Sequence, residues 1–281
     1  MFEDRFTTTA DGLRLNVRAY SGGDGTPVFC VPGLTRNAAD FEALAPALAE
    51  TARPVFAISL RGRARSDYAP DFRTYHPLVY RDDVLTALDQ LGLDRAIFIG
   101  TSLGGMVSML LHKAAPDRIA GVVINDIGPD LAPEGLARIA GYVGKTRSRV
   151  TSWEEAADQI RAINEVAFPG QDEAFWRTFA MRTFREEDGA YLLDYDAAIA
   201  RAFAEGDPPP DLWGPFETLR EKPTLLVRGE ISDLLNAPIV DKMRVAHPNF
   251  NYCEVAGVGH APTLTEPEAL AAIKTFISDL D

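Results

Sequence analysis

Hydrophobic positions along the chain form short runs that alternate with longer amphipathic segments. The short runs are almost continuously apolar, as in "PVFAISL" and "IAGVVIND", which is typical of parallel strands covered on both faces. We expect strands at residues 13–20, 27–31, 54–60, 96–100, 119–126, 223–229 and 250–257. We expect helices at residues 38–50, 78–91, 103–115 and 239–247, and a last helix from "TEPEAL" to the C-terminus. This alternation predicts an α/β protein with helices on both faces of a mostly parallel sheet.

A cluster of turn-forming residues separates the first two apolar runs. The sequence "GGDG" at residues 22–25 favours a tight turn. We therefore expect the strands at 13–20 and 27–31 to form a hairpin that opens the sheet.

The alternation stops after Asp126. From about Pro129 to Pro215 the pattern is helical, with breaks at "FPG" and "GDPPP", and it contains no convincing strand. We therefore expect an α/β core made of residues 1–128 and 216–281, and a helical cap made of residues 129–215 inserted between its two parts.

The segment "IFIGTSLGG" places a serine where a strand must turn directly into a helix. In Gly100-x-Ser102-x-Gly104 the turn strains the central residue and requires neighbours without bulky side chains. The hydroxyl would project above the carboxyl end of the sheet at a helix N-terminus, which favours developing negative charge. No lysine follows as in a phosphate-binding loop, and "GTSLGG" does not fit G-x-G-x-x-G. The pattern therefore predicts a nucleophile elbow at Ser102.

A serine nucleophile needs a base, and the chain offers four histidines. His112 lies too far along the helix after the elbow, His76 precedes Pro77 at a helix start, and His247 ends a helix. For these three, surface or capping roles are favoured. His260 stands in the Gly-rich loop "GVGHAPTLTEP" after the last strand, at the carboxyl end of the sheet where ligands of such folds bind. We expect His260 to be the base.

Two aspartates are candidates for the acid that orients His260. Asp233 follows the strand at 223–229 in "RGEISDLLNAP" and fits the chain order serine, acid, histidine. Alternatively, Ser232-Asp233 caps the next helix. Asp126 ends an earlier strand at the same edge of the sheet, although "NDIGP" is also compatible with a turn. We place Asp233 first and Asp126 as the alternative acid.

An attacked carbonyl also needs donors for its developing oxyanion. The backbone N–H of Leu103, directly after the nucleophile, is one candidate. The N–H of Leu34 in "PGLTRN" is the other, because Gly33 beside it lets the backbone approach closely. Leu34 and Leu103 therefore form the predicted oxyanion hole.

Composition and charge exclude several classes of partner. The 281 residues carry a formal net charge of −13, which argues against nucleic acid. The N-terminus has no apolar signal region, and no apolar run is long enough to span a membrane. Cys30 and Cys253 lie in strand-like runs, where buried free thiols are expected, and no metal-ligand cluster is present. We expect a cytoplasmic protein without metal or cofactor that binds a small molecule, and leave homo-oligomerisation open.

Clusters of aromatic and basic residues give weaker indications of the substrate than the serine and histidine motifs give of the reaction. All three tryptophans fall within residues 129–215, where they line a ligand pocket or, as we favour, fill the core of the cap itself. Arg61, Arg63 and Arg65 in "RGRARSD" could address an anionic substrate, but a solvated or ion-paired loop is favoured.

Taken together, the chain resembles the α/β-hydrolase superfamily with a helical cap. The segments "VPGLTRNAADFEALAPAL", "SLRGRARSDY", "FIGTSLGGMVSMLL", "VINDIGP", "RGEISDLL" and "VGHAPTLTEPE" occur in that family's order. The resemblance implies an eight-stranded α/β-hydrolase sheet with Ser102 as nucleophile, Asp233 as acid and His260 as base. The chain departs from the family at Pro32-Gly33, where His-Gly is common.

The resemblance also narrows the chemistry. Haloalkane dehalogenases and epoxide hydrolases have aspartate at the elbow, and the Gly-rich loops of proline iminopeptidases and carbon–carbon bond hydrolases are missing from "VPGLTRN". We therefore expect a carboxylesterase-like enzyme that cleaves an ester, thioester or lactone of a small, apolar substrate through an acyl-enzyme. The alternatives are a cofactor-free perhydrolase, lyase, dioxygenase or carbon–carbon bond hydrolase on the same fold, or a non-catalytic ligand sensor.

Overall fold

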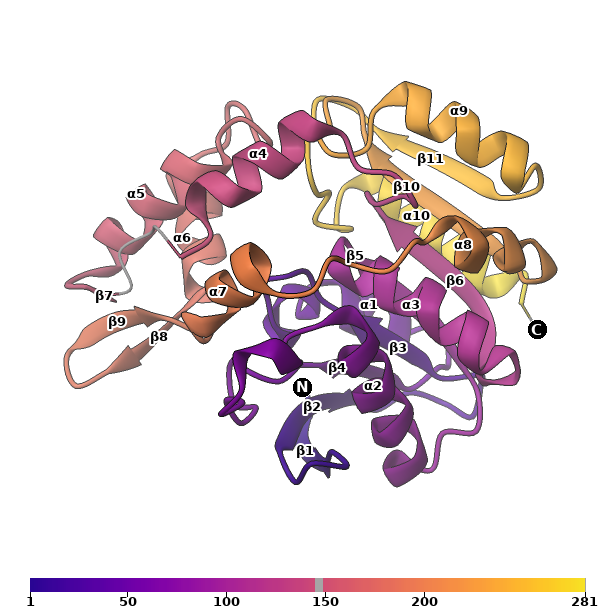
Figure 1. The fold of residues 1–281 in the computed structure, drawn as a ribbon, viewed down its shortest axis with the longest axis horizontal. Helices are drawn as coiled ribbons and strands as arrows, with labels where there is room; N and C mark the ends of the chain where they lie inside the picture. The colour runs from indigo at the N-terminus through magenta and orange to yellow at the C-terminus, as the bar shows by residue number, and fades with distance from the viewer. Residues whose placement is uncertain (145–148, 281) are drawn as a thin grey trace.

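An eight-stranded sheet forms the centre of the molecule (Figure 1). The computed structural model describes residues 1–144 and 149–280. Its strand order is β1-β2-β4-β3-β5-β6-β10-β11. The strands are β1 (Glu3–Thr8), β2 (Arg14–Tyr20), β3 (Val28–Val31), β4 (Val55–Ile58), β5 (Ala96–Thr101), β6 (Ile119–Asn125), β10 (Thr224–Gly229) and β11 (Asn251–Val255). From β4 to β11 every neighbouring pair is parallel, which confirms the predicted mostly parallel sheet.

The opening hairpin forms between different strands from those expected. Residues 3–8, for which no strand was predicted, form β1 and pair antiparallel with β2. β2 then pairs antiparallel with β4, while β3 lies between β4 and β5. The predicted hairpin between residues 13–20 and 27–31 is therefore wrong. The glycines of the "GGDG" segment let the chain cross the neighbouring backbone instead, since a Cβ at Gly22 would lie 2.0 Å from the Arg53 carbonyl oxygen.

Helices cover both faces of this sheet. The helices of the core are α1 (Leu44–Ala49), α2 (Pro77–Leu91), α3 (Leu103–Ala114), α8 (Trp213–Thr218), α9 (Ala237–Ala246) and α10 (Pro267–Ser278). Buried side chains of α2, α3, α8 and α9 join one hydrophobic cluster, and those of α1 and α10 join a second. Along β3 the side chains alternate between the two clusters, which therefore lie on opposite faces of the sheet.

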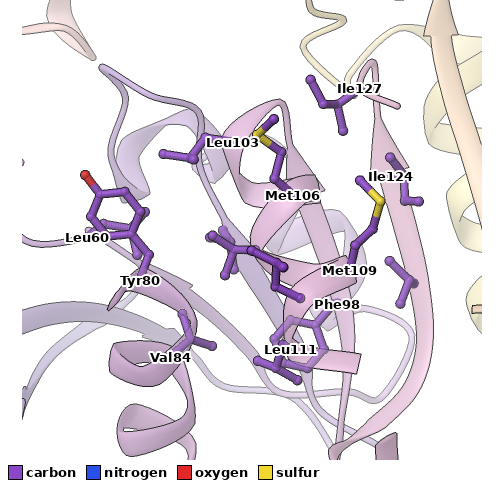
Figure 2. Close-up of a cluster of buried hydrophobic side chains, with 14 of the residues drawn as sticks. Leu60, Tyr80, Val84, Phe98, Leu103, Met106, Met109, Leu111, Ile124 and Ile127 are labelled. Carbon is purple, nitrogen blue, oxygen red and sulfur yellow. The ribbon is translucent and has the colours of Figure 1, made fainter. Parts of the chain in front are cut away.

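The cluster around α3 holds the elbow helix in place. Figure 2 shows Met106 and Met109 of α3 between the side chains of α2, including Val84, and Ile124 of β6. Ser102 directly precedes this helix. The N-terminal end of α3 is therefore fixed by packing on both sides.

The predicted helix over residues 38–50 is divided in two. Ala38–Phe41 forms a short 3₁₀ turn capped by the Asn37 side chain, which accepts the Ala39 N–H at 2.8 Å, and α1 begins at Leu44. The expected helices at α2, α3, α9 and α10 are present with shifts of a few residues at their ends.

An insert of helices and short strands lies between β6 and α8 and extends to the left in Figure 1. Its elements are α4 (Pro133–Tyr142), β7 (Arg149–Val150), α5 (Trp153–Asn164), α6 (Glu173–Met181), β8 (Phe184–Glu187), β9 (Ala190–Leu193) and α7 (Ala198–Glu205). The expectation that this segment contains no strand is wrong, because β7, β9 and β8 form a small antiparallel sheet. Asp188-Gly189, both at positive φ, makes the β8–β9 turn and was the sequence signal for it.

The division of the chain into a core and a cap stays a prediction. The predicted boundary at residue 215 falls within α8, and α8 packs on α3. In the ranges 1–144 and 149–280, no helix combines the length and the apolar character needed to cross a bilayer.

Both cysteines are free, as expected. Cys30 in β3 is buried, and this burial raises the pKa of its thiol. Cys253 in β11 is only half-buried, so the expectation of two buried thiols is met for Cys30 alone.

The close contact between α3 and β3 predicts which glycine cannot be replaced. A Cβ at Gly104 would lie 2.0 Å from the Val31 carbonyl oxygen, whereas a Cβ at Gly141 in α4 would meet nothing within 4 Å. We expect Gly104→Ala to destabilise the protein by about 1–3 kcal/mol or more. Gly141→Ala, the matched control, should be neutral or stabilising by up to about 1 kcal/mol. Urea unfolding of both variants checks this, and equal stabilities would contradict the packing described here.

Candidate active site

Ser102 lies at the sharp turn between β5 and α3. Its backbone is in the left-handed region at φ 52°, and its N–H donates to the Asn125 carbonyl oxygen at 2.9 Å. A non-glycine residue at positive φ is strained and is held there by its surroundings. Here the glycines provide the room, since a Cβ at Gly100 would lie 2.3 Å from the Gly104 carbonyl oxygen. The turn therefore has the geometry predicted for a nucleophile elbow.

His260 connects Ser102 to a buried carboxylate. Its Nε2 lies 3.0 Å from Ser102 Oγ, and its Nδ1 lies 2.8 Å from Asp126 Oδ2. The histidine comes from the loop between β11 and α10, and its side chain is 8% exposed. A hydroxyl, an imidazole and a carboxylate in this order can pass the serine proton to the imidazole and stabilise the resulting cation.

The carboxylate of Asp126 is fully buried, so hydrogen-bond donors of the protein must replace the water that would otherwise stabilise it. Besides His260, the Gly229 N–H donates to Oδ1 at 2.9 Å and the Ser232 hydroxyl donates to Oδ2 at 2.6 Å. Asp126 directly follows β6 and has a φ of 54°, a conformation that aspartate tolerates better than most residues. These donors hold the carboxylate in one orientation facing His260.

Asn125 forms hydrogen bonds to the other two segments of the site, the elbow and the His260 loop. Its carbonyl oxygen accepts the Ser102 N–H, and its Nδ2 donates to Thr101 Oγ1 at 3.1 Å and to the Pro262 carbonyl oxygen at 2.8 Å. The elbow, the end of β6 and the His260 loop are thereby joined through the backbone and the side chain of one buried residue.

The oxyanion candidates occupy neighbouring positions beside Ser102. Gly33 is close enough that an added Cβ would lie 3.8 Å from Ser102 Cβ, and Leu103 occupies the first position of α3, where the N–H has no intrahelical acceptor. The Leu34 carbonyl oxygen accepts two hydrogen bonds from the buried Arg63 guanidinium, from Nε at 3.0 Å and from Nη2 at 2.7 Å. Arg63 thus fixes the loop that carries the Leu34 N–H.

A cavity of about 460 Å³ opens above Ser102 and His260. Its walls come from the oxyanion loop, the His260 loop and the insert, and they are mainly apolar. Phe168, Phe175 and Phe179 of the insert line it, whereas the three tryptophans do not. Trp176 is buried and packs against Phe168 and Phe179, which agrees with the favoured role of tryptophan in the core of the insert. Trp153 and Trp213 are only half-buried, and Trp213 lies in α8 against Phe216 of the core, so the prediction holds for Trp176 alone.

A family model described as the α/β hydrolase fold matches residues 26–267. The chain belongs to this family. A solved α/β hydrolase from Novosphingobium aromaticivorans is 44% identical with a TM-score of 0.92, covering 99% of this chain and 98% of that one. The fold expected from the resemblance is therefore confirmed.

Two curated hydrolases are similar over most of their length. The 3-hydroxybutyrate-oligomer hydrolase of Cupriavidus necator is 31% identical over 89% of this chain and 87% of its own. The 2-(acetamidomethylene)succinate hydrolase of Mesorhizobium japonicum is 28% identical over 94% and 92%. The other relatives include Esterase YbfF of Escherichia coli, which is 25% identical over 95% of this chain and 100% of its own, so ester hydrolysis in general is supported for this α/β hydrolase.

The acid predicted first in this α/β hydrolase is not the residue that meets His260. The carboxylate of Asp233 is bound by Arg138 of α4, at 2.5 Å from Nε and 2.9 Å from Nη2. The alternative acid, Asp126, occupies the position beside His260. Nor does Ser232-Asp233 cap α9, because Asn236 does so by accepting the Ile239 N–H at 3.1 Å. The loop after β10 contributes its Ser232 hydroxyl to Asp126, while Asp233 joins the core to the insert.

The other three histidines lie away from Ser102. His76 caps α2 by accepting the Leu78 N–H at 3.3 Å, as expected. His247 is the C-cap residue of α9, as expected, and its N–H donates to the Met243 carbonyl oxygen. The side chains of His112 and His247 are buried rather than exposed, and burial lowers the pKa of both imidazoles.

The three arginines of "RGRARSD" separate into different roles. Arg61 pairs with Asp83 and Asp11, and Arg65 pairs with Asp4, as an ion-paired loop predicts. Arg63 instead supports the oxyanion loop, a role that sequence reasoning missed. Asn125 was missed as well, and its place immediately before Asp126 at the end of a buried strand was the available signal. Within the described ranges, no group of three or more histidine, cysteine or acidic side chains could hold a metal ion.

The ion pair between Asp233 and Arg138 predicts a structural role for Asp233. Burial raises the pKa of this carboxyl, but the hydrogen bonds and charge of Arg138 outweigh burial and leave the pKa below its ordinary value of 3.8. The stabilisation is therefore present above about pH 3.8 and is lost as the pH falls through the lowered pKa.

We expect a double-mutant cycle of Asp233→Asn and Arg138→Met to give a coupling free energy of about 0.5–3 kcal/mol at neutral pH. Urea unfolding measures it, and the coupling should decrease when the unfolding is repeated at successively lower pH below about 3.8, as the Asp233 carboxyl becomes protonated. A coupling that is zero at neutral pH would contradict the pairing.

Proposed function

We propose that this α/β hydrolase is a serine hydrolase that cleaves a carboxylic ester, thioester or lactone through an acyl-enzyme on Ser102. The observation that carries the proposal is the unbroken path from Ser102 Oγ through both nitrogens of His260 to Asp126, at 3.0 and 2.8 Å, at the base of a cavity. Such a path serves nucleophilic attack on a carbonyl carbon.

In the first half of the reaction, His260 Nε2 removes the proton of Ser102 as Oγ bonds to the carbonyl carbon. The electron pair of the carbonyl moves to oxygen, and Asp126 stabilises the imidazolium through Nδ1. The tetrahedral intermediate collapses when the bond to the leaving oxygen or sulfur breaks, and His260 returns its proton to that atom. The acyl group then remains on Ser102.

The N–H groups of Leu34 and Leu103 bind the oxyanion in this scheme. Loss of one such donor reduces the rate by about 10²–10³. Arg63 contributes by holding the Leu34 carbonyl, which keeps the loop in place as charge develops.

In the second half, His260 takes a proton from water, whose oxygen bonds to the acyl carbon. The ester bond to Ser102 then breaks, Ser102 Oγ regains the proton from His260, and the acid product leaves. Every proton transfer uses the same imidazole nitrogen.

The relatives support this reaction class. The curated relatives include a 3-hydroxybutyrate-oligomer hydrolase and two esterases, each similar over more than four fifths of its length. The apolar walls of the cavity favour a small substrate with a largely hydrocarbon body.

A fluorophosphonate probe and a p-nitrophenyl ester test the proposal together. We expect the probe to label Ser102 at neutral pH, and Ser102→Ala to abolish labelling and to lower kcat by about 10⁶. Asp126→Asn should lower kcat by about 10⁴, because the wrong tautomer of His260 is then held.

Asp233→Asn is the matched control, since it removes the charge of a neighbouring aspartate that pairs with Arg138. It should change kcat by less than about tenfold. If Asp233→Asn inactivates the enzyme and Asp126→Asn does not, the assignment of the acid is reversed. If the wild-type protein neither reacts with the probe nor turns over any ester, the proposed function fails and a non-catalytic role is favoured.

A further inference from the structure

Two arginines line the cavity above Ser102, and they differ in their partners. Arg36 pairs with Asp40, donates to Thr183 and lies over the ring of Phe179, with its guanidinium carbon 4.4 Å from the ring centre. For the Arg182 guanidinium, residues 1–144 and 149–280 provide no hydrogen bond, ion pair or ring contact. The cavity wall therefore contains one neutralised cation and one uncompensated cation.

The backbone of Arg182 is fixed beside the oxyanion loop. Its carbonyl oxygen accepts a hydrogen bond from Nδ2 of the buried Asn37 at 3.1 Å. Arg36, one residue before Asn37, donates to the Thr183 hydroxyl and lies over the ring of Phe179 in α6. The segment between α6 and β8 is thereby attached to the loop that carries Leu34. These contacts place Arg182 at the cavity through its backbone, while its guanidinium has no partner among the residues that the structure describes.

We propose that Arg182 binds a carboxylate of the substrate, so that the natural substrates are esters with a free carboxylate group distant from the scissile bond. This inference rests on the proposed function, because it assigns a substrate class to the same site.

The negative net charge of the protein supports a role for Arg182 in binding an anionic group of the substrate. A chain of net charge −13 has an excess of acidic side chains to pair with its arginines, and it repels anions in general. An arginine left unpaired in a mainly apolar cavity can offset that repulsion locally and bind a carboxylate in a bidentate manner.

The arrangement favours a carboxylate over a phosphate group. One guanidinium balances one negative charge, and Arg36, the second arginine of the cavity, already pairs with Asp40. A phosphate near its full charge would keep an uncompensated negative charge among apolar walls, which is costly.

The test compares two isosteric esters. One is the p-nitrophenyl monoester of adipic acid, and the other is the same ester in which the free carboxylate is replaced by a primary amide. The glutaric and suberic homologues of both are assayed in parallel so that chain length does not decide the outcome. We expect the wild-type enzyme to prefer the carboxylate member of at least one pair by about tenfold or more in kcat/KM, mainly through KM.

Arg182→Met should reduce this preference to about one, and Arg182→Lys should retain part of it, since a single charged donor remains. Arg177→Met is the control, because Arg177 lies in α6 on the exposed surface, pairs with Glu154 and does not line the cavity. It should keep the wild-type preference. Fluorophosphonate labelling of Ser102 in each variant shows that the variant is folded.

The outcomes separate the two proposals. Hydrolysis of the amide esters without any preference for the carboxylate would overturn the role of Arg182 and leave the serine hydrolase proposal intact. A preference that survives unchanged in Arg182→Met would also overturn that role. Absence of both hydrolysis and labelling in the wild-type protein would instead overturn the proposed function.

Discussion

The site depends on one buried charge, the carboxylate of Asp126. With no exposed surface, it must be stabilised entirely by protein donors, and it receives hydrogen bonds from the Gly229 N–H, the Ser232 hydroxyl and His260 Nδ1. These donors come from the last residue of β10, the loop after β10 and the loop after β11. Because all three donors bind the same carboxylate, segments more than 100 residues after Asp126 in the sequence are held against the end of β6. The His260 imidazole then faces Ser102.

The sheet order explains why this arrangement forms. β5, β6, β10 and β11 are adjacent and parallel, so the residues that follow them emerge at one edge. The insert then closes this edge from above and supplies the apolar walls of the cavity. Polar contacts attach it through Arg138 to Asp233 and through Arg36 and Asn37 to the segment around Arg182, and buried apolar side chains of the insert also join both hydrophobic clusters of the core. The core thus positions Ser102, His260 and Asp126, while the insert forms part of the cavity wall above them.

Sequence patterns predicted most of this arrangement, and the exceptions have physical causes. Ser102 and His260 stand in glycine-rich turns at strand ends, a signal that depends only on the backbone. The choice between Asp126 and Asp233 was beyond the sequence, because both follow strands that neighbour each other at the same edge. Arg138 decides it by binding Asp233, and its position depends on how α4 packs. The role of Arg63 was missed for the same reason, since a side chain that donates to a distant carbonyl leaves no periodic pattern.

The central claim is that Asp126 orients His260 towards Ser102, and a crystal structure of the fluorophosphonate-inhibited enzyme tests it most directly. We expect phosphorus bonded to Ser102 Oγ, with a phosphonyl oxygen about 2.7–3.1 Å from the backbone nitrogens of Leu34 and Leu103. We also expect His260 Nδ1 within hydrogen-bond distance of Asp126. An adduct structure in which His260 bonds to Asp233 instead, or in which Ser102 is unmodified, would contradict the account.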